Sequence, residues 1–250
     1  MKHARYVQLL ALTNHIVAIY GCIYFTEYIY IGIIAWGFVN IFCTNIALHR
    51  FMAHRSFTTT PVKEKILKYL TIIPAFGSPL SWGAMHRYHH MYSGSMQDNE
   101  NPKRIGYLRA WLTLYDPIKI PKSMVNDILK DKDYMFITKH YWKLLFSYIG
   151  VLFLIDPVLA VFLFCFPAAC VYQAAGAFGV LPHCKHFGYI VVTPRKDCTA
   201  VNSPLTSLIS WGEGWHNYHH TISKDYRHGH KWWEIDPPAW FIEHLFLKRT

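Results

Sequence analysis

The sequence predicts an all-α integral membrane protein, with four transmembrane helices in two hairpins and a cytosolic helical cap that holds a two-metal site. Three observations lead to this prediction. Hydrophobic residues make up 52% of the 250 residues and charged residues only 16%, which is typical of membrane proteins. Two long stretches contain no Lys or Arg at all. Clusters of histidine lie at or beyond the ends of those stretches.

The two stretches without Lys or Arg are Tyr6–His49 and Leu144–Cys184, and their only acidic residues are Glu27 and Asp156, respectively. A helix needs about 20 apolar residues to cross the hydrocarbon core, so each stretch is long enough for two spans joined by a turn. Asp156 precedes a proline, and the residue before proline disfavours the helical conformation. The four predicted spans are residues 6–25, 28–48, 141–155 and 157–180.

The positive charges flank the predicted hairpins. The chain carries a net charge of +10, yet its Lys and Arg residues lie before, between and after the two apolar stretches. By the positive-inside rule, both termini and the cap (residues 49–140 and 181–250) are predicted to be cytoplasmic. We therefore expect one domain over residues 1–250, in a bacterial inner membrane or an ER-type membrane. The same distribution argues against a nucleic-acid partner.

Residues 66–82 form a shorter apolar stretch, interrupted by Pro74 and Gly77. A span here would carry the second histidine cluster to the far side of the membrane. The alternatives are an interfacial or re-entrant helix and a plain helix on the soluble face. Lys63, Lys65 and Lys68 precede or enter this stretch and would suit anionic headgroups.

Eight of the sixteen histidines fall in three short motifs. Two motifs have the spacing i, i+3, i+4, which on a helix places three imidazoles on one face. The third motif has two histidines at i and i+5, so we expect a helix to end between them, or each to reach a different metal. These eight histidines are His49, His54, His86, His89, His90, His216, His219 and His220.

Clustered neutral imidazoles suit transition metals such as iron, zinc or copper. Eight ligands exceed what one ion of four to six coordination needs, so the sequence indicates two metals. The six cysteines show no C-x-x-C spacing and are predicted to be free packing residues rather than disulfides.

At these motifs the sequence resembles the membrane-bound fatty acyl desaturases, particularly the Δ9-type acyl-CoA and acyl-lipid branch. The matching segments are His49–His54, His86–His90 and Glu213–His220, the last of which reads EGWHNYHH. Asp225–Arg227 and Trp233–Trp240 are also similar to the family. The resemblance covers most of the chain from about Asn45 onward.

The resemblance implies a di-iron enzyme that uses O2 and two external electrons, reduces O2 to water and introduces a cis double bond, at the Δ9 position, into a saturated acyl chain. The family has a further Asn and His just after the fourth span. His186 lies where that histidine is expected and is predicted to be a ninth ligand. No Asn precedes it, and His183 is the nearest polar substitute, as a ligand or through a water molecule.

Other side chains have expected roles around the metals. Asp98, Glu213, Asn217 and Asp225 are candidates to orient the imidazoles through their second nitrogen. Trp82, Trp211 and Trp215 flank the motifs, and they are candidates either for an apolar substrate tunnel or for anchoring at the membrane interface. No catalytic residue is expected beyond the metal centre, because no side chain can remove hydrogen from an unactivated methylene.

The expected partners are an acyl-CoA or acyl-lipid substrate, the bilayer, and an electron donor such as ferredoxin or cytochrome b5 with its reductase. A basic cap would steer an acidic donor toward the site. One alternative function is that of a related membrane hydroxylase or ketolase. Another is a histidine-rich transport or metal-storage protein, which would place its ligands inside the spans.

Overall fold

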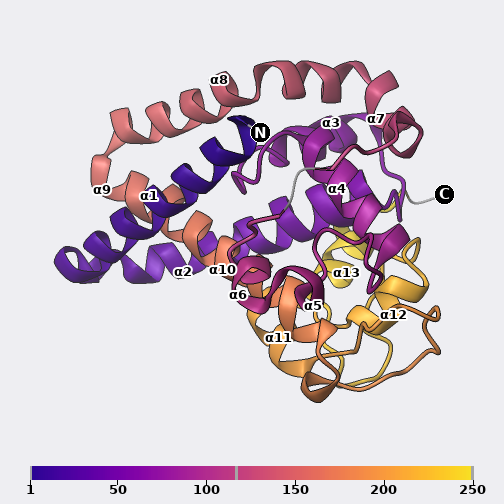
Figure 1. The fold of residues 1–250 in the computed structure, drawn as a ribbon. Helices are drawn as coiled ribbons and strands as arrows, with labels where there is room; N and C mark the ends of the chain where they lie inside the picture. The colour runs from indigo at the N-terminus through magenta and orange to yellow at the C-terminus, as the bar shows by residue number, and fades with distance from the viewer. Residues whose placement is uncertain (1, 116–117, 249–250) are drawn as a thin grey trace.

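The computed structural model describes residues 2–115 and 118–248. All named secondary-structure elements in this part of the chain are helices (Figure 1). Two isolated β-bridges join Tyr189 to Asn202 and Asn202 to Trp215. Both hairpin turns lie on one side of the molecule, on the left in Figure 1, and the cap lies on the other. The predicted all-helical class is therefore confirmed.

The first hairpin consists of α1 and a longer return helix. A single 3-10 turn, η1, contains Glu27, where the sequence predicts the turn. The return helix begins as α-helix and continues as a π-helix, in which backbone hydrogen bonds join residues i and i+5. The bounds are α1 Lys2–Tyr24, η1 Thr26–Tyr28, α2 Ile29–Phe38 and η2 Val39–Ala53.

The second hairpin turns at Asp156, as predicted. The Asp156 Oδ1 accepts hydrogen bonds from the backbone N–H groups of Val158 at 2.7 Å and Leu159 at 2.9 Å, which caps the returning helix. Pro157 follows at the first helical position, where its missing N–H costs nothing. The bounds are α8 Lys132–Ile155, α9 Pro157–Ala160, η4 Val161–Cys165 and α10 Phe166–Val180.

Within the described residues, three helical segments are long and apolar enough to cross a membrane: Arg5–Tyr24, Thr26–Ala53 and Pro157–His183. They correspond to the first, second and fourth predicted spans. The third predicted span lies in α8, which begins nine residues earlier than expected and carries Lys139 and Lys143 in its first half. Its second half is apolar and largely exposed, with Leu154 88% exposed.

The cap contains short helices joined by loops. Residues 66–82 do not form one helix, because they contain the end of one helix, a turn and the start of the next. A turn containing Pro74 and Gly77 separates α3 from α4, and Lys68 lies buried against Asp131 rather than pointing toward headgroups. The cap elements are α3 Pro61–Leu70, α4 Pro79–Tyr92, α5 Pro102–Ile105, α6 Tyr107–Trp111, η3 Lys122–Val125, α7 Asn126–Lys130, η5 Leu181–His183, η6 Lys185–Phe187, α11 Pro204–Ser210, α12 His216–Thr221, α13 Pro237–Phe241 and η7 Ile242–Phe246.

The core lies in two main regions. Among the hairpin helices, Phe162, Ile137 and Leu145 are fully buried in one cluster, and both η4 and α10 pack against α1. In the cap, Leu67 of α3 and Ile242 of η7 pack against η2. The long η2 helix therefore extends from the membrane-spanning hairpin into the cap and carries the first histidine motif with it. All six cysteines are free, as predicted.

Candidate metal centre

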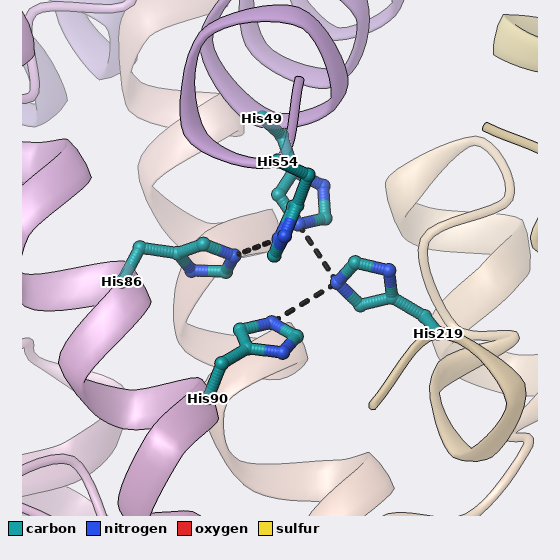
Figure 2. Close-up of side chains that lie close together, drawn as sticks. All are labelled: His49, His54, His86, His90 and His219. Atoms are coloured by element: carbon teal, nitrogen blue, oxygen red, sulfur yellow. Dashed lines mark hydrogen bonds between the residues drawn. The ribbon is translucent and has the colours of Figure 1, made fainter. Parts of the chain in front are cut away.

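Five histidines converge at the end of η2: His49, His54, His86, His90 and His219. One nitrogen from each lies within 4.8 Å of the others. The Nε2 atom of His219 lies 3.0 Å from that of His49 and 3.1 Å from that of His90, while the Nε2 atoms of His54 and His86 are 2.8 Å apart (Figure 2). We call these residues the five-histidine group.

Four more histidines form a second group beside the first: His89, His183, His216 and His220. Their nitrogens also lie within 4.8 Å of one another, and all four side chains are buried. The Nε2 atoms of His183 and His216 are 3.1 Å apart. We call these residues the four-histidine group.

The H-x-x-H-H motifs divide between the two groups in a regular way. On α4, His86 and His90 are one turn apart and join the five-histidine group, while His89 points into the four-histidine group. On α12 the division is reversed, because His216 and His220 join the four-histidine group and His219 the other. Residues i and i+4 share a face, whereas i+3 is rotated from them, so one short helix serves two centres.

The i, i+5 spacing of His49 and His54 is explained by the π-helix. Helix η2 ends at Ala53, between the two histidines, and the backbone N–H of His54 donates to the carbonyl of His49 at 3.1 Å. Their ring centroids are 4.8 Å apart. Of the two expectations for this motif, the structure has the helix end between the histidines. The two histidines do not reach different metals, because both belong to the five-histidine group.

Glu213 positions the five-histidine group. Its carboxylate lies 2.7 Å from His49 Nδ1, and it accepts a hydrogen bond from Arg50, whose Nη2 lies 2.9 Å away. Arg50 is fully buried and also pairs with Asp236 at 2.8 Å. Burial alone would raise the pKa of Glu213, but the Arg50 guanidinium and His49 hold it well below its usual value. The carboxylate is therefore ionised and fixes which nitrogen of His49 carries the proton.

Asp98 has the corresponding place beside the four-histidine group. Its carboxylate lies 3.0 Å from His89 Nδ1 and accepts backbone N–H groups from Gly94 and Glu100. Burial favours the neutral acid, but His89 and the backbone donors outweigh it and lower the pKa of Asp98. Asp98 and Glu213 are thus the two predicted orienting residues that touch a histidine of the groups.

The donor set fits metal ions. When Nδ1 of His49 donates to Glu213 and Nδ1 of His89 donates to Asp98, each Nε2 presents a lone pair to its group. Burial lowers the pKa of His86, His90 and His219 well below the usual value, so these rings are neutral at physiological pH. Both ring nitrogens of His220 are buried without a hydrogen-bond partner among the described residues. Converging neutral imidazoles with unsatisfied nitrogens are what a transition-metal centre requires.

The structure places His183, and not His186, among the candidate metal ligands, whereas the sequence favoured His186. His183 is 3% exposed and belongs to the four-histidine group. His186 is exposed, and it is in neither group. The reason is local, because the 3-10 turn η5 ends at His183 and Cys184 is extended, which directs the next turn, η6, outward.

Asn217 and Asp225 brace the third motif through its backbone and its tyrosine rather than through its imidazoles. The Asn217 Oδ1 accepts the backbone N–H groups of Val191 at 2.8 Å and Val192 at 2.9 Å. Asp225 accepts the hydroxyl of Tyr218 at 3.0 Å. Both side chains therefore hold α12 in place from outside the two groups.

A cavity of about 630 Å³ lies against the five-histidine group. His49 and His86 form part of its wall, and the rest is mainly apolar, including Trp82 and Phe178. Trp82 stacks on His86 at 4.7 Å between ring centroids. The other two tryptophans lie outside its lining: Trp211 packs on Trp36, and Trp215 is buried with its Nε1 donating to Ile235.

Three residues at the site were missed by the sequence interpretation. Arg50 lies inside the first motif, where the sequence gives no reason to distinguish it from an ordinary flanking cation. In the structure it is buried and pairs with both Glu213 and Asp236. His228 is buried, with Nδ1 3.2 Å from Glu213 and its ring 4.1 Å from that of His219. Glu100 lines the cavity, where burial raises its pKa to about 7. No spacing signal marks any of the three.

Helical segments apolar enough to cross a membrane and nine imidazoles in two groups are, by fold and site, the features of a membrane protein that can hold a metal centre. The chain belongs to the fatty acid desaturase family, whose family model matches residues 27–239.

Three similar proteins illustrate the range of the family. Delta-9 acyl-lipid desaturase 2 of Arabidopsis thaliana is 27% identical over 80% of this chain and 66% of its own length. Icosanoyl-CoA 5-desaturase of Limnanthes douglasii is 26% identical over 92% of this chain and 66% of its own length. The sn-1 stearoyl-lipid 9-desaturase of Anabaena variabilis is 30% identical over 76% of this chain and 70% of its own length. The chain therefore spans about two thirds of the length of these relatives.

Proposed function

We propose that this protein is an O2-dependent di-iron fatty acyl desaturase that introduces a cis double bond into a saturated acyl chain with two electrons from an external donor. The observation that carries the proposal is that His49 and His86 of the five-histidine group form part of the wall of a mainly apolar cavity. Such a cavity can hold a hydrocarbon chain beside the metals and keep bulk water away from it.

The proposed ligands are the nine histidines of the two groups, with His183 in place of His186. Bound iron would supply the activation of O2 that no side chain can provide. The protein's own part is to hold and orient. Glu213 and Asp98 keep the Nδ1 proton on His49 and His89, so that each ring offers its Nε2. Trp82 stacks on His86 and forms part of the cavity wall, which fixes the ring against the bound chain.

We assign Δ9 as the position of the double bond, because two of the similar proteins above are named as 9-desaturases and their names specify lipid-linked chains. The third is named as a 5-desaturase that acts on a CoA ester, so the carrier is either an acyl-CoA or an acyl-lipid. The net charge of +10 supports an acidic electron donor such as ferredoxin or cytochrome b5.

The proposed topology has four spans, with the apolar half of α8 completing the second hairpin, and both termini and the site in the cytoplasm. The Lys and Arg residues outside the hairpins support this orientation. A reporter fused after residue 250 should be active only on the cytoplasmic side, and activity only on the exterior side would contradict the orientation.

The function is tested by expressing the chain in a host with its own ferredoxin or cytochrome b5 system and analysing the fatty acids by gas chromatography. We expect a new monounsaturated acid whose double bond can be located by mass spectrometry. The matched control is His219→Ala, which should abolish the product because it removes an imidazole that faces two others. Hydroxylated acids would instead indicate a hydroxylase, and full activity of the control would contradict the assigned site.

A further inference from the structure

Three segments of the cap lie beside the same membrane-spanning helix. Trp211, at the end of α11, contacts Trp36 with ring centroids 5.9 Å apart. Phe241 of α13 contacts Phe42 at 4.8 Å, and Phe246 of η7 contacts Phe42 at 6.5 Å. Trp36 and Phe42 both belong to the candidate span Thr26–Ala53. At 1.5 Å per residue, the two contact levels are only about 9 Å apart along that helix.

Helix α3 joins the same assembly. Its Lys63 Nζ donates to the carbonyl of Leu245 at 2.6 Å, and Thr59, just before the helix, donates to the carbonyl of Phe246 at 2.5 Å. Leu67 of α3 is buried against Ile41 and Ile46 of η2. Helices α3, α11 and α13 with η7 therefore surround one length of the spanning helix, and we call them the collar.

The collar exposes large apolar side chains although it already has a packed inner face. Leu208 is 78% exposed and Trp240 54% exposed. Soluble surfaces rarely gather such side chains around one structural element. Here the element is a helix apolar enough to lie in lipid, so its neighbours at the same level meet the same surroundings. The exposed apolar residues of the collar are Val62, Ile66, Leu205, Leu208, Trp240 and Leu245.

We propose that the collar is a second membrane-binding surface, immersed in the headgroup and upper acyl region of one leaflet. Trp240 has the amphipathic ring that is enriched at this depth. Lys65 on α3 is exposed next to Ile66 and can reach lipid phosphates from the same helix. The cap therefore does not stand clear of the bilayer on the ends of the spans. It lies partly within the bilayer and covers the part of the spanning helix that precedes the metal ligands in the chain.

The proposal can be tested with spin labels attached to single introduced cysteines. Cys43, Cys165 and Cys198 are buried, and the partly exposed Cys22, Cys170 and Cys184 are first replaced by alanine, so that a thiol-reactive nitroxide labels the added residue selectively. The test positions are Leu208→Cys and Leu245→Cys. The controls are Ile34→Cys, at a 70% exposed position on α2, and Met96→Cys, at a 76% exposed position in the loop after α4.

The labelled proteins are reconstituted in phosphatidylcholine vesicles that contain phosphatidylglycerol, and collisions with O2 and with a water-soluble nickel chelate are measured. We expect the ratio of O2 to nickel collisions at residues 208 and 245 to be several-fold higher than at residue 96 and no higher than at residue 34, which lies on the span itself. Values like those at residue 96 would overturn the proposal. So would low collision rates for both reagents together with dipolar broadening, since these would show a second copy of the chain on this face.

This experiment needs neither metal nor turnover, so it is independent of the proposed desaturase activity. The label at residue 34 tests the span itself. If only residue 34 meets lipid, the collar proposal fails while the membrane span and the metal centre remain as described.

Discussion

The two histidine groups differ in how their protein support is built. In the five-histidine group, His49 is held by Glu213, and Glu213 by the buried Arg50, which also pairs with Asp236. These residues come from η2, from the loop before α12 and from the loop before α13. In the four-histidine group, His89 is held by Asp98, which also accepts hydrogen bonds from backbone N–H groups only a few residues away.

The first group therefore depends on contacts between distant parts of the chain, whereas the carboxylate of the second is fixed by its own loop. A change in the support of the first group should loosen the fold as well as the site. A change in the support of the second should affect the site alone.

The largest effect is expected from Arg50→Ala. Removal of this buried cation leaves Glu213 and Asp236 without their charge partner, and breaking a buried pair in this way costs about 3–5 kcal/mol. Thermal unfolding in detergent, followed by circular dichroism, should show a large loss of stability. The matched change on the other side, Asp98→Asn, should leave the midpoint much closer to wild type. Equal losses in the two variants would remove the distinction.

The metal stoichiometry should separate His183 from His186. We expect His183→Ala to lower the bound metal from about two ions toward one, because it removes one of four ligands from its group. His186→Ala should retain the wild-type metal content and activity, because its side chain is exposed. Metal analysis by mass spectrometry on both purified variants decides the matter, and the reverse pattern would restore the assignment made from the sequence.

Glu213→Gln and Asp98→Asn should each weaken one metal site and spare the other. Loss of a carboxylate behind a ligating histidine typically costs about 10–100-fold in metal affinity. Titration with a competing chelator should show one weakened site in each variant. Equal weakening of both sites by either substitution would mean that the two groups act as one unit.

The smallest effect concerns acid stability at the edge of the site. Asp127 binds Arg87 and Arg55, and these guanidinium groups outweigh the effect of burial and hold the pKa of Asp127 well below its ordinary value. A carboxyl group with a lowered folded-state pKa contributes stability that is present above its unfolded pKa, near 3.9, and is lost as the pH falls below it.

Because the Asp127 carboxylate is partly exposed, the contribution is reduced to about 1 kcal/mol. Asp127→Asn should therefore lower the stability at neutral pH by this amount and make it fall less steeply below about pH 4. Unfolding midpoints in detergent at several pH values would measure the difference. A steeper acid limb in the variant would contradict the assigned sign.

Local signals predicted the parts of the fold that local chemistry controls. Asp156 followed by proline gave the hairpin turn, and the returning helix has the predicted bounds. The third predicted span begins later than α8 does, because the polar first half of α8 packs against the cap and hydropathy does not report such contacts.

At the site, the three motifs could be found because clustered imidazoles have no common packing role. Their division into two groups could not, because it depends on where η2, α4, η5 and α12 meet in the folded chain. His183 was ranked below His186, since the outward turn after η5 leaves no mark in the residue types. The partners of Arg50 are 163 and 186 residues away in the chain, so its role could be seen only in three dimensions.

The π-helical form of η2 sets a rule for how this segment can change in evolution or engineering. Fifteen consecutive residues follow the wider i, i+5 turn before His54. Residue types along it can be exchanged, but deletion of one residue between 40 and 48 would rotate His49 by roughly a quarter turn relative to α2. The same deletion in a surface loop would be absorbed by its neighbours. The number of residues in this helix is therefore more strongly constrained than their types.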